Sequence, residues 1–490
     1  MIMVINVLIK FNIMSNEIIS TLPVYLTLGS VMYENLDTVI YSGFYYSTKC
    51  IIKKIVMDPK IGIKPKVIRE ISVLRNVKSD YIVKMYGVYY DNDNVYIVLE
   101  NGCENILDID KKELSDENII KNVVSGLKAL VDNNYIHGDL SFKNIVRFKD
   151  ELTDKYTYKI IDFGSSTKNY RRSTIMKPTL YIMPNEFNEP NKIKMSKIDS
   201  WALGCLHYYI FNGTIPVKCN NKKKQKRNMY LGLIHDNTNK RHGINVVYKK
   251  LFKTNQHVKN NQKSEILCSE GNIVSEKSRH NIIKLLLTIN IQNNIPIENI
   301  FLTVKLLLKL KNSNDNIGNS LLLYFLTTKL VSNITISTED ITNIINVYAP
   351  TFLKKDVNSH MFEILNELNW DIDIKTLISY TSNVAKRYSI KYLLISFVTL
   401  CYPQYDIFDT KFLHDTILLL IKCSSNNKID KKIDNKYQTY YAASSIAESI
   451  KNIQTDKNVL HDIFNKYCES IGYTNFNNII DFKKCFSLLV

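Results

Sequence analysis

Two short polar stretches, each bordered by apolar residues, constrain the fold of this chain more than any other feature. The first, "IHGDLSFKNIV", carries His137, Asp139 and Asn144, and the second, "IIDFG", carries Asp162. Ile and Val favour β-strands, so we expect short strands around residues 145 and 160 beside these polar groups. Each stretch alone is a weak signal, because "DFG" recurs by chance, so the rest of the chain has to supply the context.

The hydrophobic pattern divides the chain into two parts. Residues 24–100 contain β-like runs, the last two separated by the turn sequence "DNDN", and one helical segment interrupts them after Pro65. The pattern is mostly helical over residues 114–211. From about residue 279 to the end, apolar residues recur at three- and four-residue spacing, which predicts helices throughout. The sequence therefore indicates an α+β region followed by an all-α region.

Length, charge and cysteine content bound the class of protein. The 490 residues suffice for two or three domains, and the net charge of +17 permits acidic partners without specifying one. Direct nucleic-acid binding is not indicated beyond this charge. The Asn, Ile, Lys and Tyr content suggests an AT-rich genome, and we interpret part of the Lys excess as codon bias. The nine cysteines are scattered and form no CxxC pair, so a metal or disulfide framework is not expected and a reducing compartment fits best.

Two segments of biased composition lie outside the expected domains. The start, "MIMVINVLIKFNIM", is apolar, but Asn6 and Lys10 interrupt it and no cleavage site follows, so we expect no signal peptide. Translation from Met14 would leave this segment outside the fold. Residues 218–228, "KCNNKKKQKRN", indicate a solvated loop, with a nuclear-targeting or docking patch as the alternative. No uncharged stretch is long enough to cross a bilayer.

The polar stretches belong to a set of residues suited to phosphoryl transfer, which needs ATP held, its charge neutralised by Mg²⁺ and a hydroxyl aimed in line. Lys53, in "CIIKKI", would reach the α- and β-phosphates, and Glu70 on the following helix would hold this lysine in an ion pair. Asp139 would orient the substrate hydroxyl and accept its proton. Asn144 and Asp162 would bind Mg²⁺ through oxygen atoms.

With these residues in this order, residues 20–215 resemble eukaryotic protein kinases, especially the cyclin-dependent group. The segment "KVIREISVLRNVKSDYIVKMYGVY" is similar to that group's cyclin-contacting helix and the next strand. The segment "IDSWALGCLHYYIFNGTIP" resembles the helix whose aspartate, Asp199 here, braces the catalytic loop. The resemblance implies a two-lobed α+β fold that binds ATP and Mg²⁺ and phosphorylates Ser or Thr in a protein substrate.

The resemblance also implies which residues contact the nucleotide. Gly29 and Val39 would belong to a glycine-rich lid over the phosphates. The segment after "VYIVL" would form the adenine hinge through Leu99, Glu100 and Gly102. The second and third lid glycines are missing, and glycine is what lets a backbone approach phosphates closely, so we expect weakened nucleotide binding.

Departures near the catalytic loop bear on the substrate. Ser141 replaces the lysine that Ser/Thr kinases carry, and Lys143 stands where tyrosine kinases have a basic residue. Thr179 lies where Ser/Thr kinases keep a threonine that contacts the catalytic aspartate, which favours Ser/Thr specificity. Asn185 replaces a structural glutamate, with Glu186 next to it.

The activation segment lacks most of the usual phosphate clamp. In relatives activated on this loop, arginines hold a phosphothreonine, whose equivalent here would be Thr174. Arg69 remains, but Gly138 and Thr167 stand in place of the other arginines. We therefore predict that activity does not require phosphorylation of Thr174.

The C-terminal half resembles a cyclin box from its first helix to its fifth, then the opening helices of a second repeat. Arg279, Lys329 and "ILNELNWDI" carry most of the likeness. The acidic partner of Lys329 would fall near Met361, with Glu363 as a candidate substitute. Such a domain would press the helix of Glu70 inward within the same chain, and exchange between two chains is the alternative.

The sequence thus predicts an N-terminal extension (1–20), a kinase-like core (21–217, its end falling anywhere up to 278), a basic connector (218–260) and a cyclin-like all-α domain (261–490). Alternatives are a pseudokinase scaffold, a small-molecule kinase, because "HGDLSFKN" also resembles aminoglycoside and choline kinases, and a kinase whose C-terminal half is a docking module. An unrelated helical bundle, or leftover kinase helices, is the other interpretation of that half. We expect a cytoplasmic or nuclear protein, in a host cell if a large AT-rich DNA virus encodes it.

Overall fold

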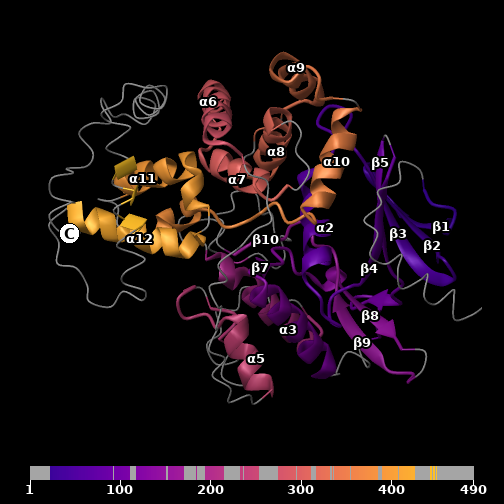
Figure 1. Cartoon of the computed structure of the whole chain (residues 1–490). Helices are drawn as coiled ribbons and strands as arrows, with labels where there is room; N and C mark the ends of the chain where they lie inside the picture. The colour runs from indigo at the N-terminus through magenta and orange to yellow at the C-terminus, as the bar shows by residue number, and fades with distance from the viewer. Residues whose placement is uncertain are drawn as a thin grey trace, which may run out of the picture. The chain divides into compact units, whose positions relative to one another are not determined.

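The computed structural model divides the chain into two compact units, which are described separately (Figure 1). The first comprises residues 1–258 together with Asn369–Asp371, and the second comprises residues 259–368 and 372–490. The structure describes residues 22–449 except 92, 111–116, 151–152, 170–183, 185–193, 215–231, 236, 253–273, 294, 311–315, 332–333, 335, 354, 385–388, 407, 425–441, 444 and 447. No helix in this described part is long and apolar enough to span a membrane.

A five-stranded antiparallel sheet opens the first unit. In spatial order its strands are β1 (Leu26–Glu34), β2 (Thr38–Tyr45), β3 (Thr48–Val56), β5 (Asn94–Glu100) and β4 (Met85–Tyr90). The expected hairpin joins β4 and β5, and the Asp91 carboxylate accepts the backbone N–H groups of Asp93 and Asn94 in its turn. Aspartate stabilises turns through such bonds, so this prediction is confirmed.

Helix α2 (Pro65–Asn76) follows the first three strands, as the sequence indicated. Pro65 fits the first helical position, where its missing N–H removes no hydrogen bond. Val67, Ile71 and Leu74 are each 3% exposed or less, which is the buried stripe that their spacing predicts. Glu70 lies within this stripe at 3% exposure, and a buried carboxylate requires a partner.

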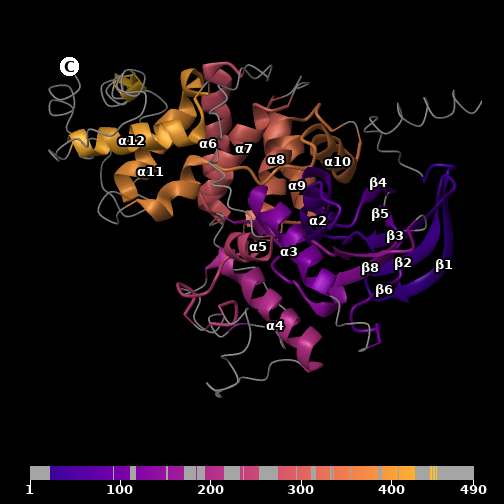
Figure 2. The same ribbon diagram turned by 90° about the horizontal axis from the view of Figure 1, so that it is seen from below.

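The rest of the first unit is mainly helical, with small sheets that carry the polar stretches (Figures 1 and 2). The strands expected around residues 145 and 160 are β8 (Ile145–Lys149) and β9 (Tyr156–Ile160), which pair antiparallel, so that prediction is confirmed. The remaining elements are β6 (Glu104–Asn105), α3 (Glu117–Asp132), β7 (Tyr135–Ile136), η2 (Phe142–Asn144), β10 (Thr167–Lys168), η6 (Met195–Lys197) and α4 (Ile198–Asn212).

The first unit continues into the segment expected to be a connector, within the range up to residue 278 given for the end of the kinase-like core. Instead of a connector over 218–260, helix α5 (Ile244–Phe252) packs against α3, and both ribbon views show the two helices together. Leu233 and Arg241 are 0% and 1% exposed. The sequence concealed this because Lys and Asn dominate the segment, while only two buried apolar residues, three apart, mark the inner face of α5.

The second unit is helical throughout its described residues, as the periodicity predicted. Its elements are α6 (Glu276–Asn293), α7 (Glu298–Leu307), α8 (Asn316–Val331), α9 (Thr338–Tyr348), α10 (Val357–Glu367), η8 (Leu377–Asn383), α11 (Ser389–Cys401), η10 (Pro403–Tyr405) and α12 (Thr410–Ser424). Between α7 and α8 the Asn299 amide donates to the Thr328 hydroxyl at 2.7 Å in the core. The helix count agrees with a cyclin-like fold without identifying one.

Candidate active site

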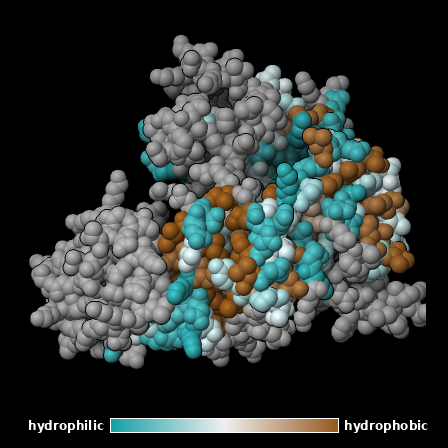
Figure 3. Space-filling model, turned by 90° about the horizontal axis from the view of Figure 1, so that it is seen from above, coloured by the Kyte–Doolittle hydropathy of each residue, from teal (hydrophilic) through white to brown (hydrophobic). Residues whose placement is uncertain are grey.

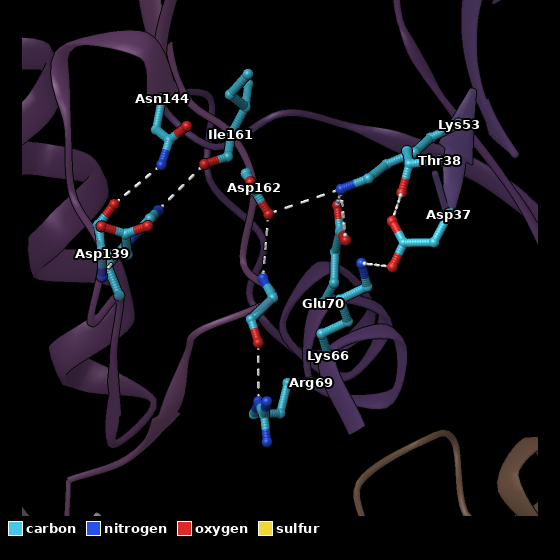
Figure 4. Close-up of polar contacts among 12 residues, drawn as sticks. Asp37, Thr38, Lys53, Lys66, Arg69, Glu70, Asp139, Asn144, Ile161 and Asp162 are labelled. Carbon is cyan, nitrogen blue, oxygen red and sulfur yellow. Dashed lines mark hydrogen bonds and ion pairs between the residues drawn. The ribbon is translucent and has the colours of Figure 1, made fainter. Parts of the chain in front are cut away.

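A buried ion pair joins the sheet to α2 (Figure 4). Lys53 on β3 places its Nζ 2.9 and 2.8 Å from the two carboxylate oxygens of Glu70, and the two side chains are 17% and 4% exposed. Burial alone would lower the pKa of Lys53, but the charges of Glu70 and Asp162 outweigh burial and raise it above its ordinary value. The lysine is therefore a fixed cation at the edge of the site.

Asp162 occupies a strained backbone position beside this pair. Its φ is 59°, a left-handed conformation that residues other than glycine seldom adopt. Its half-exposed carboxylate lies 3.6 Å from Nζ of Lys53 and accepts the backbone N–H of Gly164 at 3.3 Å. Burial would raise the pKa of Asp162, but the positive charge of Lys53 holds it below its ordinary value. The carboxylate is therefore ionised and aimed at the same place as the lysine.

His137 and Asp199 fix the first polar stretch. The Asp199 carboxylate, 3% exposed, accepts the backbone N–H groups of His137 and Gly138 at 2.7 and 2.9 Å, as the resemblance implied. Nδ1 of His137 accepts the N–H of Asp139 at 3.3 Å, so we assign the proton to Nε2, which donates to the carbonyl of Ile161 at 3.1 Å. These bonds hold Asp139 beside the "DFG" stretch.

Asn144 and Asp162 form a donor set that fits Mg²⁺. The Asn144 amide nitrogen donates to the backbone carbonyl of Asp139 at 2.9 Å, which leaves the amide oxygen as the accepting end of the group. Mg²⁺ prefers such oxygens and usually takes one or two protein ligands together with substrate phosphates. The described residues hold no cluster of three or more His, Cys, Asp or Glu side chains suited to a metal.

The predicted adenine hinge is anchored to the sheet below it. Leu99 is buried at the end of β5. The Glu100 carboxylate pairs with Nζ of Lys159 on β9 at 2.8 Å. A Cβ at Gly102 would lie 2.5 Å from Cγ1 of Val146, so only glycine lets this segment pass so close to β8. The structure thus places all three predicted hinge residues on one fixed segment.

Strands β1 and β2 carry Gly29 and Val39, the two residues that the sequence assigns to a nucleotide lid. Gly29 lies so close to β2 that a Cβ there would be 2.9 Å from the carbonyl oxygen of Ser42. Ile40, not Val39, is the residue opposite Lys53 on β3. Opposed residues share a face and neighbours alternate, so Val39 points away from the face of Lys53. Val39 thus lies on the face of β2 opposite to that of Lys53, and its part in nucleotide binding stays a prediction.

The activation segment is described only in part. Four residues singled out in the sequence lie outside the described residues: Thr174, Thr179, Asn185 and Glu186. Arg69, the clamp residue that remains, donates from Nε to the carbonyl of Gly164 at 2.8 Å. Gly138 has a φ of 83° and contributes no side chain. Arg69 is thus joined to the "DFG" glycine, and the dispensability of Thr174 stays a prediction.

The residues that carried the cyclin likeness are buried within the second unit. Arg279 on α6 is 2% exposed, and Nη1 lies 3.0 Å from Oδ1 of Asp406 while Nη2 contacts the other oxygen. Lys329 on α8 is 7% exposed. Glu363, its candidate partner, lies 2.6 Å from Nζ of Lys355. The buried pair of Arg279 and Asp406 joins α6 to the segment before α12, and the part of Arg279 and Lys329 in a cyclin-like contact stays a prediction.

Two supporting cations were missed in the sequence. Lys159 fixes the hinge through Glu100, and its place inside the apolar run "TYKII" was a signal that its charge needs a partner. Arg241 donates to the backbone carbonyls of His235 and Lys197, and its guanidinium carbon lies 4.8 Å from the centre of the Trp201 ring. No local pattern marks Arg241, because two of its partners, Lys197 and Trp201, come from a distant segment.

Comparison with known proteins identifies one domain. Residues 39–242 match the family model described as "Protein kinase domain". The serine/threonine-protein kinase polo of Drosophila melanogaster is 29% identical over 195 residues, 38% of this chain and 32% of that protein. An Aurora kinase of Encephalitozoon cuniculi is 31% identical over 170 residues, 32% of this chain and 59% of that protein.

A third relative, the serine/threonine-protein kinase cst-1 of Caenorhabditis elegans, is 30% identical over 176 residues, 34% of this chain and 33% of that protein. This chain therefore spans about a third of the length of the polo and cst-1 kinases. None of the three is named a cyclin-dependent kinase, and the matched family region ends at residue 242.

Proposed function

We propose, on the premise that residues 39–242 are a eukaryotic protein kinase domain, that this chain transfers phosphate from ATP to serine or threonine hydroxyls of protein substrates. The observation that carries the proposal is the formed Lys53–Glu70 ion pair beside Asp162, with Asp139 held next to them by the His137 network. The relatives named serine/threonine-protein kinases support the substrate class.

In the proposed reaction a new P–O bond forms from the substrate hydroxyl to the γ-phosphorus, and the bond to the β-phosphate oxygen breaks. Asp139 orients the hydroxyl and accepts its proton. Lys53, held by Glu70, positions the α- and β-phosphates. Asn144 and Asp162 would hold Mg²⁺, which when bound neutralises phosphate charge. The protein's part is mainly positioning and electrostatic stabilisation.

The proposal includes activity without phosphate on Thr174. Three observations support it: Glu70 already pairs with Lys53, Arg69 is joined to the carbonyl of Gly164, and Gly138 offers no clamp side chain. A phosphate would therefore find few of the cations that order such loops elsewhere.

The proposal also gives the C-terminal half a role in holding α2 in place, as the cyclin resemblance implies. Asn369 is one of the three residues from that half that belong to the first unit. Within this unit its side-chain amide donates to the Asn76 side chain at the end of α2, at 3.3 Å, and accepts from Arg75 at 3.4 Å. A support at the end of α2 stabilises the helix that carries Glu70.

A second candidate is a pseudokinase that binds nucleotide weakly and transfers no phosphate. The observation that favours it is the lid, where Gly29 is the only glycine in β1. A small-molecule kinase, suggested by the likeness of "HGDLSFKN", is distinguished by the phosphate acceptor alone.

The test is transfer of labelled phosphate to a generic basic protein by the full-length chain. The full-length Thr174→Ala variant should match the wild type, and full-length Asp162→Asn should be inactive. A chain ending at residue 258 should be weakly active and regain activity when residues 259–490 are added. Equal activity of the short chain would contradict the role given to the C-terminal half. No transfer by any form, with nucleotide still bound, would establish the pseudokinase.

A further inference from the structure

The turn at the tip of the lid is tied to the start of α2. Oδ2 of Asp37 lies 2.7 Å from Nζ of Lys66 and 3.1 Å from Nζ of Lys64. Oδ1 of Asp37 accepts the hydroxyl of Thr38 at 3.0 Å, and the Asp37 side chain is 33% exposed. Figure 4 shows the contact between Asp37 and Lys66 beside the pair of Lys53 and Glu70.

The turn that carries Asp37 has a fixed shape. The Asn35 side-chain oxygen accepts the N–H groups of Asp37 and Thr38 at 3.1 and 2.9 Å. The N–H of Val56 on β3 donates to the carbonyl of Asp37 at 2.9 Å. Asparagine turns of this kind fix the backbone where glycine would leave it free. A rigid turn does not change its backbone conformation to fit phosphates. The position of the lid therefore depends on where Asp37 is held.

The charge at the start of α2 favours an anionic anchor. Lys64 precedes the helix without capping it by its side chain, and the first turn contains no acidic residue. Lysines at a helix N-terminus oppose the helix dipole, so an incoming carboxylate relieves an unfavourable arrangement. The hydrogen bond from Lys66 is the largest effect that holds the pKa of Asp37 well below its ordinary value. Asp37 is therefore ionised at neutral pH.

The same face of α2 reaches the rest of the site. A Cβ built on Gly164 would lie 3.5 Å from Cβ of Lys66, and Arg69 donates to the Gly164 carbonyl. Glu70 lies four residues after Lys66 and holds Lys53. Residues three and four apart share a helix face, so one stripe of α2 contacts the lid, the lysine and the "DFG" stretch.

We propose that Asp37 is a positioning residue for the nucleotide. Its ion pairs with Lys64 and Lys66, the lid clasp, hold the lid on α2 and replace the missing glycine contacts. This inference rests on the proposed function, because that function supplies the nucleotide that the lid covers. Lys66 of the clasp and Glu70 both lie on α2, so an outward shift of this helix breaks the clasp and the Lys53–Glu70 pair. The lid therefore closes when the Lys53–Glu70 pair forms.

The test measures binding of the β,γ-imido analogue of ATP with Mg²⁺ to the full-length chain by calorimetry. Asp37→Asn keeps the size of the side chain but removes its charge, and should raise the dissociation constant about fivefold, the effect expected from partly exposed ion pairs. Lys66→Gln should act in the same direction. In the Asp37→Asn background, Lys66→Gln should weaken binding far less than it does alone. Asp132→Asn, which removes an exposed ion pair with Lys128 on α3, is the matched control and should change nothing.

Hydrogen exchange without nucleotide gives an independent readout, because Asp37→Asn should speed exchange of the amides of the lid turn. Unchanged affinity in Asp37→Asn, or fully additive effects of the two substitutions, would overturn the clasp. If the affinity pattern holds while no form transfers phosphate, the clasp stands and the proposed function fails. If the wild type binds no nucleotide, the positioning role of Asp37 is overturned, whatever the exchange of the lid turn.

Discussion

Among single residues, Glu70 carries the sharpest expectation. Glu70→Gln preserves the shape of the side chain but removes its negative charge. The remaining carboxylate partner of Lys53 is then Asp162, at 3.6 Å. Misplacing a positioning group by about 1 Å costs about 100-fold in rate. We therefore expect kcat/KM for phosphate transfer to fall about 100-fold, measured at several ATP concentrations.

The control for this substitution is Glu363→Gln, which breaks the ion pair with Lys355. The Lys355 side chain is 60% exposed and the Glu363 side chain is 46% exposed. Exposed pairs contribute little, so its kinetics should match the wild type. If Glu70→Gln retained wild-type kcat/KM, the ion pair would have no role in positioning the phosphates.

His207 on α4 gives a pH-dependent prediction. Burial lowers the pKa of this histidine from 6.5 to about 4. The unfolded chain binds the proton first, so the stability due to neutral His207 is complete above pH 6.5 and is lost as the pH falls toward 4. At pH 5 the loss is about 2 kcal/mol.

The measurement is urea unfolding of the wild type and of His207→Gln at pH 7.5 and pH 5. The variant cannot gain this proton, so it should lose about 2 kcal/mol less stability between the two pH values. Because other buried histidines titrate in both proteins, the difference between them isolates His207. Equal losses would contradict the assignment.

The residue-scale comparison shows what spacing can and cannot reveal. Lys53, Glu70 and Asp162 were identified because each lies in a motif of fixed order. Val39 lies on the face of β2 opposite to that of Lys53, which spacing could not reveal, since a strand repeats every two residues and a single step changes the face. Asp37 was missed because its lysine partners follow it by almost thirty residues and only the folded lid brings them together.

At the scale of elements, the hinge and β8 make a tight contact at Gly102. Gly102→Ala would place a methyl group 2.5 Å from Cγ1 of Val146 and 3.0 Å from the Phe148 ring, so β8 or the hinge must move. Such overpacking costs about 1–3 kcal/mol. We expect a lower melting temperature and weaker nucleotide binding, measured by thermal unfolding with and without nucleotide.

A matched control is Gly243→Ala, where only the flexible end of Lys197 lies close, at 3.2 Å. This variant should keep wild-type nucleotide affinity. If Gly102→Ala also kept it, the hinge would have more freedom than its close approach to β8 indicates.

Elements were predicted well where propensity and burial agree, and poorly where composition masked them. Helix α2 and strands β8 and β9 were expected because a proline start or β-branched runs coincide with their buried faces. Helix α5 was missed because four of its nine residues are lysine, asparagine or tyrosine, and its short apolar face packs against the distant α3.

On the scale of the whole molecule, the switch from mixed to purely helical periodicity predicted two parts correctly. It could not give their boundary, because the end of the first unit is decided by packing of α5 rather than by any break in pattern. The cyclin likeness rests on pattern alone, and helical periodicity is common to many all-α folds. Among the described residues on the face seen in Figure 3, brown hydrophobic and teal hydrophilic residues are interleaved.

Whether the two units act as one enzyme is tested best from the second unit. Arg279 is 2% exposed and pairs with Asp406, so Asp406→Ala leaves a buried guanidinium without this carboxylate. The loss should destabilise the second unit by about 3 kcal/mol. If that unit supports α2, phosphate transfer in the variant should fail at the lowered temperature at which the second unit unfolds, although residues 39–242 are unchanged.

The measurement follows transfer rate and helix content of the full-length wild type and Asp406→Ala over the same temperatures. Glu363→Gln, at an exposed pair of the same unit, should leave both curves at their wild-type positions. A variant whose helices melt early while transfer continues to the wild-type temperature would mean that the kinase domain works alone. We expect Asp406→Ala to lose helix content and phosphate transfer at one temperature, which lies below the melting temperature of the wild type. The reason is that the second unit supports α2 only while the second unit is folded.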